Sequence, residues 1–297
     1  MRFSILLATL GRTREVEQFL KSIAAQTYRD FEVLIIDQNP DNRLNEIIYL
    51  FAGEFPIRHL QCASGHSRAF NFGLREATGE IIAFPDDDCW YDPDLLERVS
   101  KKLDAHPEVG GITGREIVEE GFVSGGRWDA ASGPLTPRNV WRRAISFTMF
   151  LRQSTVDGSS FDETLGVGAG TPWGAGEETD FLLRLIRQGH RILYDPSVAV
   201  WHQGRSGPYT AAVFDRARSY GRGMGRVLRK HGYPAWLVAN HLIRPLVGVT
   251  AALAMGRLKK ARYHWHIFAG RSRGWSAGLG TATPPAARLV SRAEDLT

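Results

Sequence analysis

The sequence feature that most constrains the fold is the apolar run Ile81–Phe84, which is followed by three consecutive carboxylates, Asp86, Asp87 and Asp88. A short run without polar residues is typical of a strand covered on both faces, as in parallel sheets flanked by helices. Ligands of such sheets bind beyond the carboxyl ends of the strands. Three adjacent carboxylates repel one another unless a cation joins them. The run therefore predicts an interior strand with a metal site at its end.

A hard divalent cation fits this acidic turn. Carboxylate oxygens are the ligands that Mg²⁺ or Mn²⁺ prefers, and Mg²⁺ sites commonly combine one or two carboxylates with substrate phosphates. We therefore expect a diphosphate-bearing substrate beside the cation. The alternative is a solvated turn in which Asp88 or Asp92 caps the helix that begins near Pro93.

The first half of the chain alternates strand-like and helix-like patterns. This alternation predicts an α/β fold with a Rossmann-like, mostly parallel sheet flanked by helices. Continuous apolar runs predict further strands at Phe3–Ala8, Glu32–Asp37 and Ile57–Leu60, and helical spacing predicts a helix at Ser67–Ala77. A later, less regular stretch contains one more predicted strand, Ile145–Leu151.

Composition indicates a folded protein of a reducing compartment. The chain has 297 residues, of which 43% are hydrophobic and 23% charged, so it can bury one large core or two smaller ones. Cys62 and Cys89 are too few for a disulfide framework. The first ten residues are interpreted as a strand and not a signal peptide, because the apolar run breaks at Gly11 without a small-residue cleavage site.

The charge is unevenly distributed along the chain. Residues 203–297 contain sixteen Lys and Arg against three acids, whereas residues 1–202 carry a net charge of −8. Within the basic part, Ala235–Gly256 is mostly apolar but is interrupted by Arg244 and Pro245. We therefore expect an interfacial or re-entrant hairpin there, because a central Arg is costly in a spanning helix.

Basic residues interleaved with aromatic ones follow this apolar stretch, a pattern that suits an anionic cytoplasmic leaflet. We expect a cytoplasmic protein that is peripheral on the inner face of the cell membrane. A helical subdomain with a solvated basic face is the alternative. No nucleic-acid partner is expected, because no recognisable nucleic-acid module is present.

Polar residues at the ends of two other predicted strands fit a nucleotide. Because the carboxyl ends of parallel strands share one edge, Ala8, Thr9 and Asp37 should lie near the acidic triplet. Thr9 and Asp37 can bond to a base or ribose, and Arg12 or Arg68 can meet phosphate charge. Structural roles are equally open: Thr9 as a cap, Asp37 in a turn, and Arg68 extended over a helix surface.

The chain resembles the family 2 glycosyltransferases of the GT-A fold, from about Phe3 to His202. The resemblance rests on six segments in this order: Ser4–Arg12, Phe31–Asp37, Gly65–Gly73, Ala77–Glu80, Asp86–Asp88 and Gly176–Leu185. It implies transfer of a sugar from a nucleotide-diphosphate donor to an acceptor hydroxyl, with inversion at the anomeric carbon. A UDP-sugar is favoured, with GDP or dTDP donors open. A lipid-linked or saccharide acceptor is expected, as in cell-surface polysaccharide or glycolipid synthesis.

The resemblance also implies roles for single residues. Asp88 resembles the principal ligand of Mn²⁺ or Mg²⁺, Asp86 a direct or water-mediated metal contact, and Asp87 the ribose contact. Two positions depart from the family pattern. Gln38 stands where a second Asp often reads the base, although its amide can still pair with uracil. Leu10 and the glycine after it replace a frequent Tyr-Asn pair.

The implied mechanism needs a base for the acceptor hydroxyl, and Glu178 matches the second residue of the family's Glu-Asp pair. A partly apolar pocket beside Trp173 would raise the pKa of a glutamate toward the working pH. Asp180 is the rival base. We expect Trp173, Gly174 and Glu177 at the acceptor. Glu177 and Asp180 also fit the first turn of a helix, where acids are favourable.

His202 ends a predicted strand, Ser197–Trp201. In some GT-A enzymes a histidine at this place joins the metal or the diphosphate, and a structural role is equally open. Arg205, in the Gly-rich segment Gly204–Gly207, is expected to close over the diphosphate as a lid.

We expect a catalytic domain at residues 1–205, with a nucleotide-binding half at about 1–106 and an acceptor half at about 107–205. A basic and apolar helical extension, 206–297, should follow. Two other functions stay open. One is a sugar-1-phosphate nucleotidyltransferase, whose Gly-rich phosphate loop is poorly matched after the first strand. The other is a catalytically silent glycosyltransferase-like scaffold at the membrane.

Overall fold

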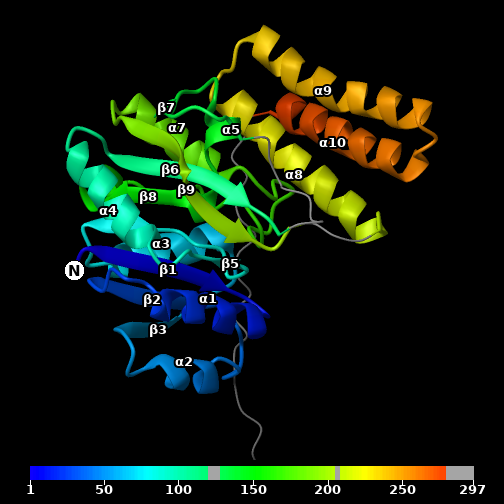
Figure 1. The fold of residues 1–297 in the computed structure, drawn as a ribbon. Helices are drawn as coiled ribbons and strands as arrows, with labels where there is room; N and C mark the ends of the chain where they lie inside the picture. The colour runs from blue at the N-terminus through cyan, green and yellow to red at the C-terminus, as the bar shows by residue number, and fades with distance from the viewer. Residues whose placement is uncertain (120–127, 205–207, 279–297) are drawn as a thin grey trace, which may run out of the picture.

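A nine-stranded sheet forms the centre of the protein, in the strand order β3-β2-β1-β4-β8-β6-β9-β5, with β7 paired to β9 (Figure 1). The computed structural model describes residues 1–119, 128–204 and 208–278. The first four strands are parallel to one another: β1 (Phe3–Thr9), β2 (Phe31–Asp37), β3 (Ile57–Gln61) and β4 (Ile81–Ala83). The strands predicted at Phe3–Ala8, Glu32–Asp37, Ile57–Leu60 and Ile81–Phe84 are therefore confirmed.

Pairing is mixed in the second half of the sheet. The strand β8 is antiparallel to both β4 and β6, whereas β6 and β9 are parallel. The strands here are β5 (Cys89–Trp90), β6 (Gly111–Ile117), β7 (Gly133–Pro134), β8 (Met149–Arg152) and β9 (Ile192–His202). The strand predicted at Ile145–Leu151 begins only at Met149, because Ser146–Thr148 form a 3-10 turn.

Helices cover both faces of the sheet, which explains why its inner strands are apolar throughout. Along β1, Ile5 packs with α1, α2 and α4 on one face, whereas Leu6 packs with α3 and α7 on the other. The helices before the C-terminal region are α1 (Arg14–Ala24), α2 (Asn45–Phe51), α3 (His66–Glu76), α4 (Leu95–Ala105), α5 (Val140–Arg143), α6 (Gln153–Val156) and α7 (Glu177–Arg187). The helix predicted at Ser67–Ala77 corresponds to α3.

Three long helices follow the sheet: α8 (Ala211–Lys230), α9 (Ala235–Ala254) and α10 (Leu258–Ser276). Figure 1 shows them side by side, and α10 packs against both α8 and α9. Glycines make the α8–α10 approach close. A Cβ at Gly225 would lie 2.2 Å from the backbone oxygen of Arg271, and one at Gly274 would lie 2.0 Å from that of Arg222.

The hairpin predicted within Ala235–Gly256 is wrong, because α9 runs unbroken through Pro245. Proline cannot supply the N–H that normally bonds to the carbonyl four residues earlier, here that of His241. Nη1 of Arg271, on α10, donates to this carbonyl at 2.6 Å instead. A side chain from the neighbouring helix thus satisfies the group that Pro245 leaves unpaired, and the helix continues.

The helix α8 packs against the part of the chain that contains the sheet. Val227 belongs to the same apolar core as α3 and α7. A Cβ at Gly223 would lie 2.0 Å from the backbone oxygen of Ala175, and one at Gly174 would lie 2.2 Å from Oγ of Ser219. The helical part expected after residue 205 therefore packs closely, through α8, on the part that contains the sheet.

Candidate metal and nucleotide site

The acidic triplet lies at the carboxyl end of the sheet, beside the end of β1. Asp86 bridges to Ala8 in parallel fashion directly after β4. Oγ1 of Thr9 donates a hydrogen bond to Oδ2 of Asp87 at 2.7 Å. The guanidinium of Arg12 pairs with Asp87 and lies 2.7 Å from Oδ2 of Asp88. The structure thus brings Ala8, Thr9 and Arg12 to the triplet.

Asp86, Asp88 and His202 form a cluster that can hold a divalent cation. One ligand atom from each residue lies within 4.8 Å of the other two, and Nε2 of His202 is 3.1 Å from Oδ1 of Asp88. Burial, with a contribution from Asp88, raises the pKa of Asp86 to about 7. Because a desolvated carboxylate favours a compensating cation, this donor set of two carboxylates and an imidazole fits Mn²⁺ or Mg²⁺.

His202 is fixed on three sides. The ring of Phe147 stacks on it at 4.7 Å with an interplanar angle of 6°. Nδ1 of His202 lies 3.2 Å from Oε1 of Glu116, opposite the nitrogen that faces Asp88. Burial lowers the pKa of His202, but the hydrogen bonds to Asp88 and Glu116 outweigh it and raise the pKa to about 10. Glu116 was not predicted from the sequence, although an acid inside the strand pattern Gly111–Ile117 is a detectable signal.

Asp37 and Gln38 lie at the end of β2 and support the loops around the site. Asp37 is fully buried and accepts hydrogen bonds from Asn39, from Nε2 of His59 at 2.9 Å and from Nε2 of Gln61 at 3.1 Å. Oε1 of Gln38 accepts a hydrogen bond from the backbone N–H of Gly65 at 2.8 Å. The carboxylate of Asp37 is therefore already held by protein donors.

Arg68 contacts the loop opposite α3. Its Nη1 donates to the carbonyl of Ser64 at 2.8 Å, and its Nε lies 3.3 Å from Oε2 of Glu163. Arg205 lies outside the described residues.

Two glutamates begin α7. Gly176 precedes them with a φ of 95°, and a Cβ there would also lie 2.9 Å from Val227. Glu177 is buried, and its pKa is raised well above the usual value by burial, by Glu178 and by Asp86. Burial also raises the pKa of Glu178. Its carboxylate lies 3.5 Å from the hydroxyl of Thr179, a distance too long for a strong hydrogen bond. Glu178 is thus a carboxylate with raised proton affinity, and its neighbour Glu177 is near enough to Asp86 for the two charges to interact.

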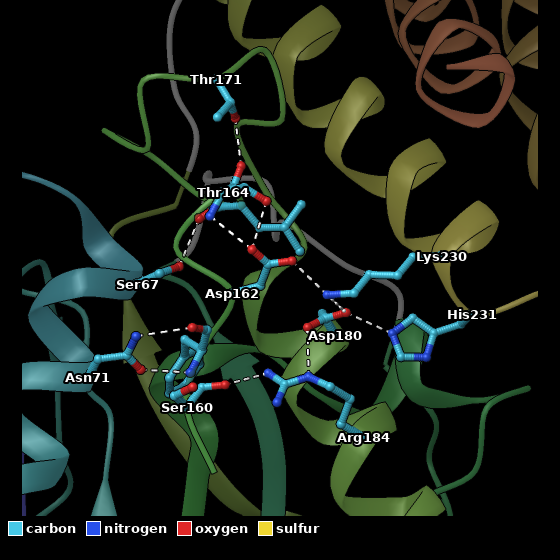
Figure 2. A network of polar contacts seen from close by, with 12 residues as sticks. Ser67, Asn71, Ser160, Asp162, Thr164, Thr171, Asp180, Arg184, Lys230 and His231 are labelled. Atoms are coloured by element: carbon cyan, nitrogen blue, oxygen red, sulfur yellow. Dashed lines mark hydrogen bonds and ion pairs between the residues drawn. The ribbon is translucent and has the colours of Figure 1, made fainter. Parts of the chain in front are cut away.

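Asp180, the rival base, has a different role. It is fully buried, and three side chains hold both its oxygens: Oδ1 lies 2.8 Å from Nζ of Lys230 and 2.8 Å from Nε2 of His231, and Nε of Arg184 donates to Oδ2 at 2.9 Å (Figure 2). Burial opposes ionisation, but these partners outweigh it and lower the pKa to about 2. A carboxylate with so low a proton affinity is a poor general base, so the geometry contradicts that assignment.

These contacts belong to a network that we call the Asp180 latch, formed by Asp162, Asp180, Arg184, Lys230 and His231. Nζ of Lys230 also lies 2.6 Å from Oδ2 of Asp162, and Arg184 donates to the carbonyl of Ser160 at 2.5 Å. Figure 2 shows that the latch joins α7, the end of α8 and the loop that contains Asp162, which is in turn bonded to α3.

The expected acceptor segment lies between α8 and the start of α7. The guanidinium carbon of Arg226 lies 5.4 Å from the ring centroid of Trp173, and Gly174 packs on Ser219. With Glu177 at the first position of α7, the three predicted acceptor residues occupy one continuous segment backed by α8.

Solved structures share this fold. A mannosyltransferase from Pyrobaculum calidifontis, solved with GDP-Man and Mn²⁺, has a TM-score of 0.64 at 18% identity, covering 92% of this chain and 86% of that one. Residues 1–349 of S. aureus TarS, in complex with UDP-GlcNAc, give 0.60 at 15% identity, with coverage of 88% and 90%. The fold is therefore that of the GT-A glycosyltransferases.

Comparison of the sequence with known families identifies the family of this protein. The chain belongs to glycosyl transferase family 2, whose profile matches residues 4–157, just over half of the chain. An uncharacterized glycosyltransferase of Haemophilus influenzae is 25% identical over 191 residues, 62% of either protein. A PGL/p-HBAD biosynthesis glycosyltransferase of Mycobacterium bovis is 33% identical over 150 residues, 49% of this chain and 58% of the relative. The chain thus spans less than two thirds of the length of these relatives.

Proposed function

We propose that the protein is a metal-dependent, inverting glycosyltransferase that moves a sugar from a nucleotide-diphosphate sugar to an acceptor hydroxyl. The observation that carries the proposal is the cluster of Asp86, Asp88 and His202, together with its proximity to the start of α7, where Asp86 contributes to the raised pKa of Glu177. GT-A proteins solved with GDP-Man and Mn²⁺ or with UDP-GlcNAc support it.

In the proposed reaction, Glu178 accepts the proton of the acceptor hydroxyl. The hydroxyl oxygen then bonds to the anomeric carbon, while the bond from that carbon to the diphosphate oxygen breaks on the opposite face, which inverts the configuration. The cation held by Asp86, Asp88 and His202 would stabilise the negative charge of the leaving diphosphate. The raised pKa of Glu178 suits the base, because proton transfer is efficient when the pKa lies near the working pH.

The nucleoside is assigned to the edge formed by β1 and β2. Asp87, held by Thr9 and Arg12, is assigned to the ribose, and Arg12 can turn to the diphosphate when donor and cation arrive. We favour a UDP-sugar: the amide of Gln38 has the donor and acceptor that uracil requires, and it would exchange its present bonds to Gly65 and Thr9 for the base. GDP and dTDP sugars are the other donors to test.

The first experiment is a thermal-shift panel of UDP, GDP and dTDP sugars with and without Mn²⁺, followed by product analysis. We expect stabilisation that needs both metal and Asp88, and release of nucleoside diphosphate. Asp88→Asn should abolish the shift, whereas Asp41→Asn, a change at an exposed ion pair with Arg43, should preserve it. Release of pyrophosphate would indicate a nucleotidyltransferase. If no nucleotide binds, the remaining hypothesis is a catalytically silent, glycosyltransferase-like scaffold.

We also propose that the C-terminal helices dock on an anionic membrane surface. In the described part of the chain, seven of the twelve exposed large apolar side chains lie between residues 236 and 265. We call this set the α9–α10 face: Trp236, Ile243, Val247, Leu253, Met255, Leu258 and Trp265. Residues 216–278 contain thirteen Lys and Arg and no Asp or Glu. Apolar and aromatic side chains among basic ones favour the interface of anionic lipids.

By length and composition, α9 is the one helix among the described residues that is suited to cross a membrane, and 28% of its most apolar stretch is buried. Its packing on α10, and the hydrogen bond from Arg271 to His241, favour a helix that lies on the surface as part of a docked unit. A peripheral location on the inner leaflet would place the catalytic edge near a lipid-linked acceptor.

Vesicle sedimentation tests this docking. We expect binding to phosphatidylcholine vesicles that contain phosphatidylglycerol, weaker binding at high salt, and weaker binding to phosphatidylcholine alone. Ile243→Ser with Val247→Ser should reduce binding. Tyr49→Ser with Leu50→Ser, which alters two even more exposed apolar side chains on α2, is the matched control. Equal binding by both double variants would refute the α9–α10 face as the docking surface.

A further inference from the structure

We propose that Glu116 is a positioning residue for the metal centre: its carboxylate faces Nδ1 of His202 and keeps the proton on that nitrogen when Nε2 binds the cation together with Asp86 and Asp88. The inference rests on the proposed metal site and adds a residue to it that does not touch the cation. Nδ1 of His202 lies 3.2 Å from Oε1 of Glu116, and Nε2 lies 3.1 Å from Oδ1 of Asp88. The imidazole therefore bridges a carboxylate on one side and the ligand cluster on the other.

The register of the sheet explains why these two residues meet. Thr113 pairs with Tyr194, but after an irregularity Glu116 pairs with Val200, so β9 contains three residues more than β6 between these pairs. Residues two apart on a strand share a face, which places His202 on the same face as Val200 and Glu116. Without the extra residues, Glu116 would pair with Ser197 and lie on the opposite face from His202. Such irregularities commonly re-aim side chains beside active sites.

Because Glu116 is buried, its carboxylate needs a hydrogen-bonding or charged partner. Glu116 is only 4% exposed, and a buried carboxylate costs several kcal/mol unless it is paired and hydrogen-bonded. The imidazole of His202 supplies such a partner. Packing needs alone would be met by an apolar residue, as at Val198 and Val200 on the facing strand.

The chemistry of a histidine ligand explains what the carboxylate contributes. A metal binds the nitrogen that carries no proton, so the proton must sit on the other nitrogen, and a hydrogen-bond acceptor at that nitrogen selects this tautomer. Phe147 fixes the plane of the ring by stacking. Glu116 fixes the rotation of the His202 ring within that plane and keeps the proton on Nδ1. Loss of such partners typically weakens metal binding about 10–100-fold.

The test is the dissociation constant of Mn²⁺, measured by electron paramagnetic resonance on the full chain without nucleotide. We expect Glu116→Ala to weaken binding about 10-fold or more. Glu116→Gln should weaken it less, because the amide oxygen still accepts the Nδ1–H bond but lacks the charge. Glu108→Gln is the matched control: this exposed glutamate lies 3.6 Å from Nδ1 of His106, and its loss should change nothing.

A double-mutant cycle separates positioning from a general structural effect. If Glu116 acts through His202, Glu116→Ala should weaken Mn²⁺ binding no further in a His202→Ala background. An equal loss in both backgrounds, or a folded Glu116→Ala protein with unchanged affinity, would overturn the proposal. If the alanine variant does not fold, unchanged affinity in Glu116→Gln decides against it. Failure of the unaltered protein to bind Mn²⁺ would reject the metal site itself, and the role of Glu116 with it.

Discussion

The Asp180 latch should make a large contribution to stability, and that contribution should depend on pH. The partners of Asp180 lower its pKa from 3.8 to about 2. This difference stabilises the folded protein by about 2.4 kcal/mol at neutral pH. Asp180→Asn removes that contribution and leaves Lys230 and Arg184, which are partly exposed, with one anionic partner fewer, so we expect a total loss of about 3 kcal/mol.

The pH dependence has a defined sign. A carboxylate whose pKa is lower in the folded state stabilises fully above its unfolded pKa of 3.8, and the stabilisation disappears as pH falls through about 2. About half of it should remain at pH 3. The difference in unfolding free energy between the unaltered protein and Asp180→Asn should therefore shrink between pH 7 and pH 3.

Urea unfolding followed by tryptophan fluorescence measures this difference at each pH. Asp104→Asn is the control, because its ion pair with Arg2 is exposed on the Asp104 side and should contribute less than about 1 kcal/mol. An Asp180→Asn protein with an unchanged midpoint at pH 7 would refute the argument. So would a difference that stays constant down to pH 3.

Three further outcomes follow from the geometry. Arg12→Gln should tighten the binding of Mn²⁺ in the absence of nucleotide, because it removes a positive charge that lies 2.7 Å from Oδ2 of Asp88; paramagnetic resonance measures this affinity, and weaker Mn²⁺ binding would contradict the expectation. The same variant should bind the sugar donor more weakly, as measured by calorimetry. Glu178→Gln should lower turnover at least about 100-fold while donor affinity is retained, and near-normal turnover in a kinetic assay would exclude it as the base. Gly274→Ala should cost about 1–3 kcal/mol in a denaturant titration, because its Cβ would lie 2.0 Å from the backbone oxygen of Arg222, whereas Gly53→Ala meets nothing within 4 Å and should be tolerated.

The parts of the site that the sequence predicts are those fixed by local pattern and by sheet geometry. Apolar runs that end in polar residues identify the strands, and parallel pairing then places Thr9 beside Asp87, which are 78 positions apart but joined by a 2.7 Å hydrogen bond. His202 was a candidate because it ends a strand-like run. These inferences need only the rule that the carboxyl ends of parallel strands share one edge.

The parts that the sequence does not predict depend on distant partners. Asp180 and Glu178 look alike in the first turn of α7, and only Lys230 and His231, about 50 positions later, distinguish a paired carboxylate from an accessible one. Pro245 suggested a break in α9 because its compensating donor, Arg271, comes from another helix. Glu116 meets His202 only through a three-residue register shift, which the hydrophobic pattern does not reveal.

The packing of α8 limits how the protein can be dissected. A truncation at residue 205, where the composition changes, would remove Lys230 and His231 and leave Asp180 with only Arg184 as a charged partner of its latch. It would also uncover the backbone of Ala175 just before Glu177 and Glu178. The shortest fragment expected to keep the candidate site intact therefore ends after α8, so a truncation that separates the proposed donor chemistry from the proposed membrane docking has to be made between α8 and α9.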